Sequence, residues 1–264
     1  MGNSGIRAVS NQSTPQHVLV TGAAGKIGRA VCRELTSRGH VVRSFDRDVL
    51  PAGLKQNIEV VDGELDDAEA VRRAVSGMDC IIHLAAYPDV ADFMTELLPA
   101  NVIGLYHVLE AARAEHVQRL VLTSSVQVTW GLNWHERTIS VEEPPAPPNH
   151  YAVTKVLAEV WGRMYAQEYG MSVIVVRPGA CPRSQEQIDL IGKTFEDPSS
   201  IYLSPGDVGR FYAQCVEAKG IDFSILFAMS KAMGHVAYDI EPARQLIGYE
   251  PQDQWPVGCD VDLP

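Results

Sequence analysis

The chain has 264 residues, of which 46% are hydrophobic and 21% are charged, an ordinary balance for a globular protein with a packed core. Its 22 Lys and Arg against 33 Asp and Glu give a formal charge of −11, which would repel the phosphates of nucleic acids and of anionic lipids. We therefore expect neither nucleic acid nor membrane as a partner, and no apolar stretch is long enough to be a membrane span. Residues 1–15, rich in Gly, Ser and Asn, predict a disordered tail and not a secretory signal.

The cysteines and histidines indicate a cytoplasmic protein without a metal site. The five cysteines are an odd number and have no C-x-x-C spacing, which favours a reducing compartment over a disulfide framework. The eight histidines show neither an H-E-x-x-H motif nor paired metal-ligand spacing.

From residue 17 onward, short β-branched runs alternate with longer segments that have helical spacing. We expect strands at residues 17–21, 41–45, 58–61, 80–84, 120–124, 172–177 and 223–227. Between them we expect helices at residues 26–38, 68–75, 99–115, 151–169 and 207–219. This alternation is typical of βαβ units, so the sequence predicts an α/β fold with a doubly wound parallel sheet of about seven strands.

The first expected strand runs into a turn that has three glycines, each three residues from the next. Gly22 permits the tight turn, Gly25 lets the backbone approach a pyrophosphate, and Gly28 lets the following helix pack closely on the sheet. Free N–H groups at the start of that helix would face phosphate oxygens. The strand, the helix and the acidic end of the second strand together predict a dinucleotide site.

Asp46 ends the second expected strand, eighteen residues after Gly28, where a carboxylate can accept hydrogen bonds from both ribose hydroxyls. The same charge would repel the 2′-phosphate of NADP, so NAD is favoured over NADP. Arg47 is adjacent, and its guanidinium could offset part of that repulsion.

Three further side chains suggest acid–base chemistry at the same edge of the sheet. Tyr151 and Lys155 are four residues apart, so both point from one face of a helix. A phenol ordinarily titrates at about pH 10, and a cation such as Lys155 or an oxidised nicotinamide would favour its charged form. Ser125 follows the apolar run at residues 120–124, at the carboxyl edge where ligands bind in such folds. Its hydroxyl could hold a substrate oxygen against the phenol or could satisfy loop backbone instead.

These motifs, with His83-Leu84-Ala85-Ala86 and Asn101, resemble the extended short-chain dehydrogenase/reductase superfamily, also called the NAD-dependent epimerase/dehydratase family. The resemblance covers roughly residues 17–179. It implies a Rossmann fold that binds NAD, with Tyr151 as the catalytic acid–base, Lys155 holding the ribose and lowering the phenol pKa, and Ser125 positioning substrate. It also implies a homodimer, and it implies that Asn101 is the helix asparagine that supports the active-site backbone, with purely local bonding as the alternative. The expected cofactor-binding residues are Gly22, Gly25, Lys26, Ile27, Gly28, Asp46, Arg47, Glu64, Leu65, Leu84, Ala85, Ala86, Asn101, Tyr151, Lys155 and Pro178.

Within the superfamily the chain is most similar to the uronate dehydrogenase-like group, notably in the segments at residues 101–106 and 110–113. That group carries Asn-His after the two serines, whereas this chain has Val126-Gln127, and its carboxylate-binding arginine would fall near Asp189. Arg183 could replace that arginine as the carboxylate-binding residue, with a different geometry. The expected substrate contacts are Tyr87, Ser125, Val126, Gln127, Ala180 and Arg183. Trp130, Trp134 and His135 could form a wall of the substrate site or simply pack their loop.

The sequence thus predicts an NAD-binding Rossmann core at residues 16–180, followed at residues 181–264 by a small substrate cap with the final core strand and helices. The predicted function is an NAD-dependent oxidoreductase that transfers hydride between the nicotinamide and a hydroxyl-bearing carbon of a small substrate, a sugar or sugar acid derivative. Two alternatives stay open. One is a nucleotide-sugar epimerase or dehydratase, and the other is a catalytically quiet NAD-binding regulator, because the departures from the family pattern affect substrate contacts and leave the cofactor site intact.

Overall fold

The computed structural model describes residues 14–256. Nearly all of the expected disordered tail at residues 1–15, as well as Cys259, lies outside the described residues. None of the described helices is both long enough and apolar enough to cross a membrane.

The centre of the fold is one sheet of seven parallel strands in the order β3-β2-β1-β4-β5-β6-β7. The strands are β1 (His17–Thr21), β2 (Val41–Asp46), β3 (Ile58–Asp62), β4 (Cys80–His83), β5 (Arg119–Thr123), β6 (Ser172–Pro178) and β7 (Phe223–Ala228). The predicted fold class is confirmed, and each strand boundary lies within one residue of the expected one. The chain order reverses between β1 and β4, and in open parallel sheets ligands bind outside the carboxyl ends at this point.

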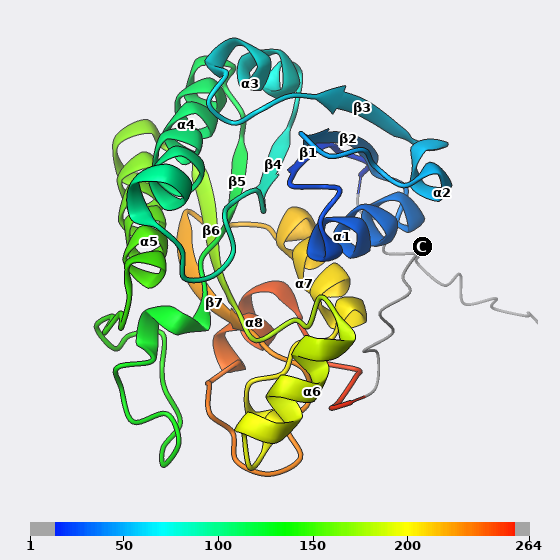
Figure 1. Cartoon of the computed structure of the whole chain (residues 1–264). Helices are drawn as coiled ribbons and strands as arrows, with labels where there is room; N and C mark the ends of the chain where they lie inside the picture. The colour runs from blue at the N-terminus through cyan, green and yellow to red at the C-terminus, as the bar shows by residue number, and fades with distance from the viewer. Residues whose placement is uncertain (1–13, 257–264) are drawn as a thin grey trace, which may run out of the picture.

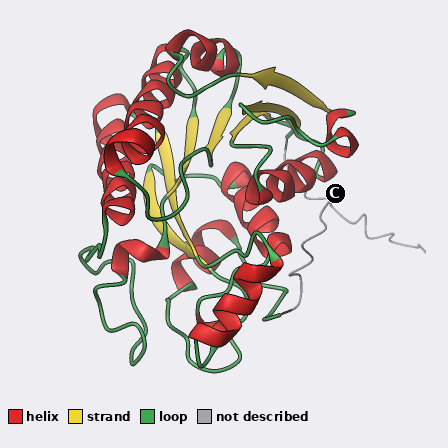
Figure 2. Ribbon diagram, in the orientation of Figure 1, coloured by secondary structure: helices red, strands yellow, loops and turns green. Residues whose placement is uncertain are grey.

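Helices cover both faces of the sheet (Figures 1 and 2). One face carries α1 (Lys26–Ser37), α7 (Pro205–Glu217) and α8 (Glu241–Ile247), and the other carries α3 (Ala68–Val75), α4 (Gly104–Ala114) and α5 (His150–Tyr169). In β1, Val18 and Val20 belong to the first core and Leu19 to the second, because successive strand side chains point to opposite faces. The apolar composition of the strands follows from this burial on both faces.

The helix expected at residues 99–115 is wrong at its start. The structure has a π-helix, η1 (Phe93–Ile103), that leads directly into α4 and contains Pro99 in its interior. Proline is common at the first position of a helix, which is why the sequence pattern favoured a start there. The true start is capped by Asp92, whose carboxylate accepts the N–H groups of Met94 and Thr95 at 3.0 and 2.9 Å. The wider i to i+5 turns of η1 accommodate the proline that would interrupt an α-helix.

The shorter elements are α2 (Ala52–Lys55), the 3₁₀-helix η2 (Val126–Thr129), α6 (Gln185–Thr194) and the 3₁₀-helix η3 (Pro198–Ser200). Within residues 181–256, β7 completes the sheet and α7 packs on α1. α6 differs from these, because none of its ten residues, all of which are described, is fully buried.

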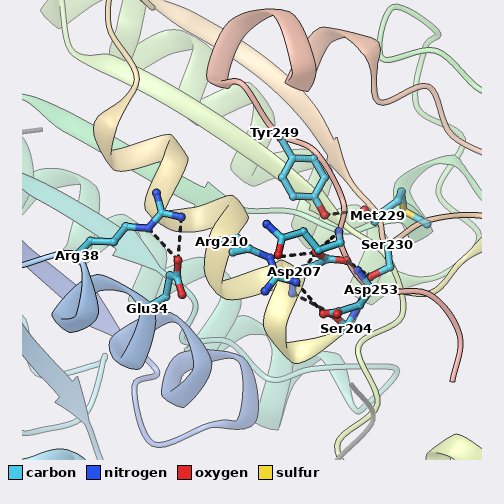
Figure 3. Close-up of polar contacts among 10 residues, drawn as sticks. Glu34, Arg38, Ser204, Asp207, Arg210, Met229, Ser230, Tyr249 and Asp253 are labelled. Carbon is cyan, nitrogen blue, oxygen red and sulfur yellow. Dashed lines mark hydrogen bonds and ion pairs between the residues drawn. The ribbon is translucent and has the colours of Figure 1, made fainter. Parts of the chain in front are cut away.

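A buried carboxylate fastens the last described segment to α7 (Figure 3). Asp207 is fully buried, and its oxygens accept hydrogen bonds from Ser230 Oγ at 2.6 Å, from Arg210 Nη2 at 2.6 Å, and from the backbone N–H groups of residues 252 and 253 at 2.9 and 3.1 Å. Ser204, the N-cap of α7, also donates to Asp253 at 2.6 Å. These contacts join α7, the end of β7 and the segment that follows α8.

Candidate active site

The carboxyl ends of the central strands open onto a cleft of about 890 Å³. Its lining comes from the loops after β1, β2, β3, β4, β5 and β6, from η1, from the start of α5 and from α6. Every predicted site residue except Asn101 lines this cleft. The topology therefore brings together segments from Gly22 to Arg183.

The glycine turn at one end of the cleft can be built only with glycines at two of its positions. Gly22 has a φ of +72°, and a Cβ there would lie 2.7 Å from the backbone nitrogen of Ala85. A Cβ at Gly28 would lie 2.2 Å from the carbonyl oxygen of Gly22. Gly25 is the N-cap of α1 and has no side chain to occupy the N–H groups of the first helical turn. These N–H groups, which border the cleft, are the donors that a pyrophosphate needs.

Asp46 holds the glycine turn against the end of β2. Its carboxylate accepts the backbone N–H of Ala24 at 2.8 Å and that of Asp48 at 3.0 Å. Arg47 Nη1 lies 4.0 Å from Glu64 Oε2, and both side chains are exposed. The cleft at this end is also lined by Asp48 and Asp66, so negative charge dominates where a 2′-phosphate would have to bind.

The three predicted catalytic side chains all line the cleft. Tyr151 and Lys155 are both buried on the first turns of α5, which Asn149 caps by accepting the N–H of Ala152 at 2.8 Å. Lys155 Nζ donates to the carbonyl oxygen of Thr123 at 3.1 Å and lies 5.6 Å from the centre of the Tyr151 ring. Ser125 caps η2 by accepting the N–H of Gln127 at 3.1 Å.

Burial is the main influence on the acid–base properties of these groups. It raises the pKa of Tyr151 to about 12, against a hydrogen bond from Ser125 that lowers it, while the charge of Asp89 raises this pKa and that of Arg183 lowers it. Burial also lowers the pKa of Lys155 to about 8. The resemblance implied that Lys155 lowers the phenol pKa, but in this structure the desolvation of the phenol outweighs any such effect.

His83, next to this group, is held neutral. Burial, together with the charge of Lys155, lowers its pKa to about 3. Its Nδ1 is hydrogen-bonded to Thr21 Oγ1 at 2.8 Å, which ties the end of β4 to the end of β1.

Asn101, expected to contact the cofactor, lies behind the cleft and not in its wall. It is buried in η1, where its Oδ1 accepts the N–H of Tyr87 at 2.7 Å and its Nδ2 donates to the Tyr87 carbonyl and to Thr154 Oγ1, each at 3.1 Å. The side chain therefore braces the loop after β4 against α5. A sequence motif marks this position without telling whether its side chain meets a ligand or the backbone.

The predicted substrate contacts line the cleft together with Asp89. Arg183 Nη2 lies 3.4 Å from Asp89 Oδ2, and this pair links the loop after β6 to the loop after β4. Asp89 has a φ of 102°, a conformation that residues other than glycine rarely adopt. Gln127 accepts a hydrogen bond from Asn149 Nδ2 at 3.2 Å, and Val126 is buried.

The apolar wall of the cleft was predicted only in part. Trp130 lines the cleft, whereas Trp134 is buried in a separate small core and His135 is exposed beside it. The other wall residues come from α6 and the segment after it: Leu190, Ile191, Thr194 and Phe195. The signal that could have revealed α6 is the spacing from Ser184 to Gln187, typical of a capping box, and the Gln187 N–H does donate to Ser184 Oγ at 3.3 Å.

Comparisons with known proteins agree with this geometry. The sequence model of the NAD dependent epimerase/dehydratase family matches residues 18–181. The chain is 29% identical over 252 residues to L-arabinose 1-dehydrogenase (NAD(P)(+)) of Haloferax volcanii, covering 89% of this chain and 96% of that protein. It is 34% identical over 188 residues to uronate dehydrogenase of Agrobacterium fabrum, covering 71% and 70%.

Among solved structures, a variant of uronate dehydrogenase from Agrobacterium tumefaciens complexed with NAD superimposes with a TM-score of 0.76 at 29% identity, covering 91% of this chain and 86% of that one. The predicted resemblance and the predicted cofactor are therefore confirmed. The chain belongs to the NAD dependent epimerase/dehydratase family, as an NAD-dependent oxidoreductase of the extended short-chain dehydrogenase/reductase type.

Proposed function

We propose that this enzyme oxidises a hydroxyl-bearing carbon of a sugar or sugar acid, with Tyr151 as the acid–base group. The observation that carries the proposal is the convergence of Ser125, Tyr151 and Lys155 within the cleft that the glycine turn and Asp46 also line. When bound in this cleft, NAD supplies the hydride acceptor. Positioning the reacting groups in this way is a large source of rate in enzymes.

The roles of the three side chains follow from their chemistry. The phenolate oxygen of Tyr151 would accept the proton of the substrate hydroxyl as the C–H bond gives up its hydride. Ser125 would donate a hydrogen bond to the substrate oxygen and hold it against the phenol. Lys155, close to the Tyr151 ring, would stabilise the phenolate by its charge, which opposes the desolvation that raises the phenol pKa.

The remaining predicted site residues have roles along the cleft. Gly22, Gly25, Lys26, Ile27 and Gly28 would hold the pyrophosphate. Asp46 and Arg47, with Glu64 and Leu65, would hold the adenosine, while Leu84, Ala85, Ala86 and Pro178 would border the rest of the cofactor; all of these line the cleft. Tyr87, Val126, Gln127, Ala180 and Arg183 would surround the substrate.

The relatives support a sugar or a sugar acid as the substrate, since their names refer to L-arabinose and uronates. The charge of Arg183 lowers the pKa of Tyr151, and this guanidinium could meet an acidic group of the substrate by leaving Asp89. Trp130 would offer an aromatic face to the sugar ring. We further propose that residues 16–180 bind the cofactor and that the substrate cap within residues 181–264 is α6 and its flanking loops.

The experiment that tests this function is a substrate panel read by the absorbance of reduced nicotinamide. Aldoses, sugar acids and sugar nucleotides are each supplied with NAD and, separately, with NADP. We expect one class of substrate to reduce the cofactor, preferentially NAD. In Tyr151→Phe the rate of this reaction should be about 10²- to 10⁴-fold lower, with NAD binding retained. Tight NAD binding without hydride transfer to any class would favour the regulator, and interconversion of sugar nucleotides without net reduction would favour the epimerase.

We also propose a homodimer formed through α4 and α5. Tyr106 on α4 and Val160 on α5 are 50% and 58% exposed, and the rings of Tyr106 and Trp161 lie 6.2 Å apart, which makes one apolar surface across both helices. A second copy of the chain would cover it. Sedimentation velocity should show a dimer that Val160→Glu converts to monomer, whereas a monomeric wild-type protein would refute this contact.

The thiols support the cytoplasm as the compartment. Cys32 and Cys80 are buried, burial raises the pKa of each thiol to about 12, and no disulfide joins the cysteines at positions 14–256. Cell fractionation tests this, and recovery of the protein from an oxidising compartment would contradict it.

A further inference from the structure

A buried ion pair lies one helical turn beyond Lys155. Glu159 follows Tyr151 by eight residues and Lys155 by four, so the three side chains project from one face of α5. Glu159 is 5% exposed and Arg177, near the end of β6, is 1% exposed. Figure 1 shows α5 alongside β5 and β6.

The Glu159 carboxylate joins three elements of the fold. Its Oε1 accepts from Ser124 Oγ at 2.6 Å and from Arg177 Nε at 2.8 Å, and its Oε2 accepts from Arg177 Nη2 at 2.8 Å. A guanidinium fork against a carboxylate fixes both distance and orientation. α5 is therefore held in one register against the carboxyl ends of β5 and β6.

The segment that carries Ser125 is held from both sides by these contacts. The Ser124 N–H donates to the carbonyl of Val176 at 2.7 Å, and the Thr123 carbonyl accepts from Lys155 Nζ at 3.1 Å. Lys155 and Glu159, on successive turns of α5, thus bind Thr123 and Ser124 at the end of β5. The next residue is Ser125. A shift of α5 along β5 or β6 would move Tyr151 and Lys155 relative to the Ser125 hydroxyl.

The stability of the fold does not by itself call for an ion pair at this place. Burying two charges costs desolvation that their attraction only offsets, and apolar pairs of similar volume are often as stable. What an apolar pair lacks is directional contact. We propose that Glu159, through Arg177 and Ser124, is a positioning residue that sets the catalytic geometry of Ser125, Tyr151 and Lys155. This inference rests on the proposed function.

The decisive variant is the double substitution Glu159→Leu with Arg177→Met, which replaces the whole pair by apolar side chains and leaves no buried charge unpaired. Glu159→Gln alone leaves Arg177 uncompensated and can fail to fold. Ser124→Ala removes one hydrogen bond and keeps the ion pair. The matched control is Glu115→Gln, the same chemical change as Glu159→Gln in a surface pair with Arg72.

We expect the double variant to fold and to bind NAD within about twofold of wild type, since it does not touch the glycine turn, while kcat falls roughly ten- to hundredfold. Ser124→Ala should lower kcat by a smaller factor, and Glu115→Gln should leave it unchanged. A purely structural pair would lower the melting temperature without changing kcat of the folded enzyme. The proposal is overturned if the double variant, folded and saturated with NAD, keeps wild-type kcat.

A second readout does not depend on activity. The pKa of Lys155, which burial lowers to about 8, can be followed by NMR with ¹³Cε-labelled lysine and assigned with Lys155→Gln. If the pair holds Lys155 in its buried place beside His83 and Tyr151, this pKa should move toward its ordinary value of 10.5 in the double variant and in Ser124→Ala, but not in the control. An unmoved pKa would contradict the proposal. If wild type transfers no hydride to any substrate, the proposed function fails while this titration still decides the positioning role.

Discussion

Substituting Gly28 by alanine tests the cofactor turn at its tightest point. The new Cβ would lie 2.2 Å from the carbonyl oxygen of Gly22 and 2.6 Å from Cα of Ala23, where ordinary contact begins at 3.4 Å. Both neighbours are backbone of the turn itself, so the turn must move by about 1 Å. Overpacking of this kind costs about 1–3 kcal/mol. Because the turn that must shift carries the N–H groups expected to bind the pyrophosphate, we expect most of this cost to appear in NAD binding, as a Kd raised roughly 5- to 150-fold.

The assay is calorimetric titration of NAD with thermal unfolding of the same samples. Gly53→Ala is the matched control, since a Cβ at Gly53, within the short helix α2, meets nothing within 4 Å. It should leave the Kd unchanged and stabilise slightly, by up to about 1 kcal/mol, because alanine favours helix over glycine. Wild-type NAD affinity in Gly28→Ala, or an equal loss in Gly53→Ala, would show that the close packing at Gly28 does not set the affinity for NAD.

Three further predictions follow from buried and cofactor-facing charges. Burial lowers the pKa of His83 from 6.5 to about 3, so neutral His83 contributes stability that is complete above about pH 6.5 and is lost as the pH falls toward 3. In urea titrations the unfolding free energy of wild type should therefore fall by up to about 1.4 kcal/mol per pH unit in this range, a slope that His83→Gln lacks. Equal slopes in the two proteins would contradict this. Asp207→Ala leaves three other donors without an acceptor and leaves Arg210 paired with Asp253 alone, so it should cost about 3–5 kcal/mol of unfolding free energy. The exposed Asp222→Ala should cost less than about 0.5 kcal/mol, and similar losses in both variants would be inconsistent with the network. Asp46→Ser removes a charged acceptor from the N–H groups of Ala24 and Asp48, and it should weaken the affinity for NAD about tenfold while raising the preference for NADP over NAD. The assay is titration with both cofactors, and an unchanged preference would show that Asp46 does not face the ribose.

The sheet and the cofactor turn could be predicted from local sequence because their determinants are local. β-branched runs buried on both faces end at turns or charges, which places every strand to within one residue. Gly22 and Gly28 are required by backbone contacts inside one strand–turn–helix unit. Asp46 lies at the end of the neighbouring strand, and parallel pairing of β1 with β2 brings it to that turn.

The parts that sequence reasoning missed depend on contacts between distant segments. Pro99 has the local signature of a helix start, and only the i to i+5 turns that begin after Asp92 show otherwise. Asn101 was expected both among the cofactor contacts and as a support for the active-site backbone, and its hydrogen bonds to Tyr87 and Thr154 fit the second role. The apolar wall from α6 follows from how residues 181–204 fold back over the cleft, which motifs elsewhere in the chain do not specify.

The proposed reaction is hydride transfer from the substrate carbon to NAD, with Tyr151 as the acid–base group. It is tested most directly with a substrate deuterated at the oxidised carbon, once the panel has identified the substrate class, by mass spectrometry of the reduced cofactor and single-turnover kinetics. We expect one deuterium in each reduced cofactor formed by wild type. We also expect a rate about 10²- to 10⁴-fold lower in Tyr151→Phe at unchanged NAD affinity. Reduced cofactor without deuterium, or a Tyr151→Phe rate equal to that of wild type, would contradict it.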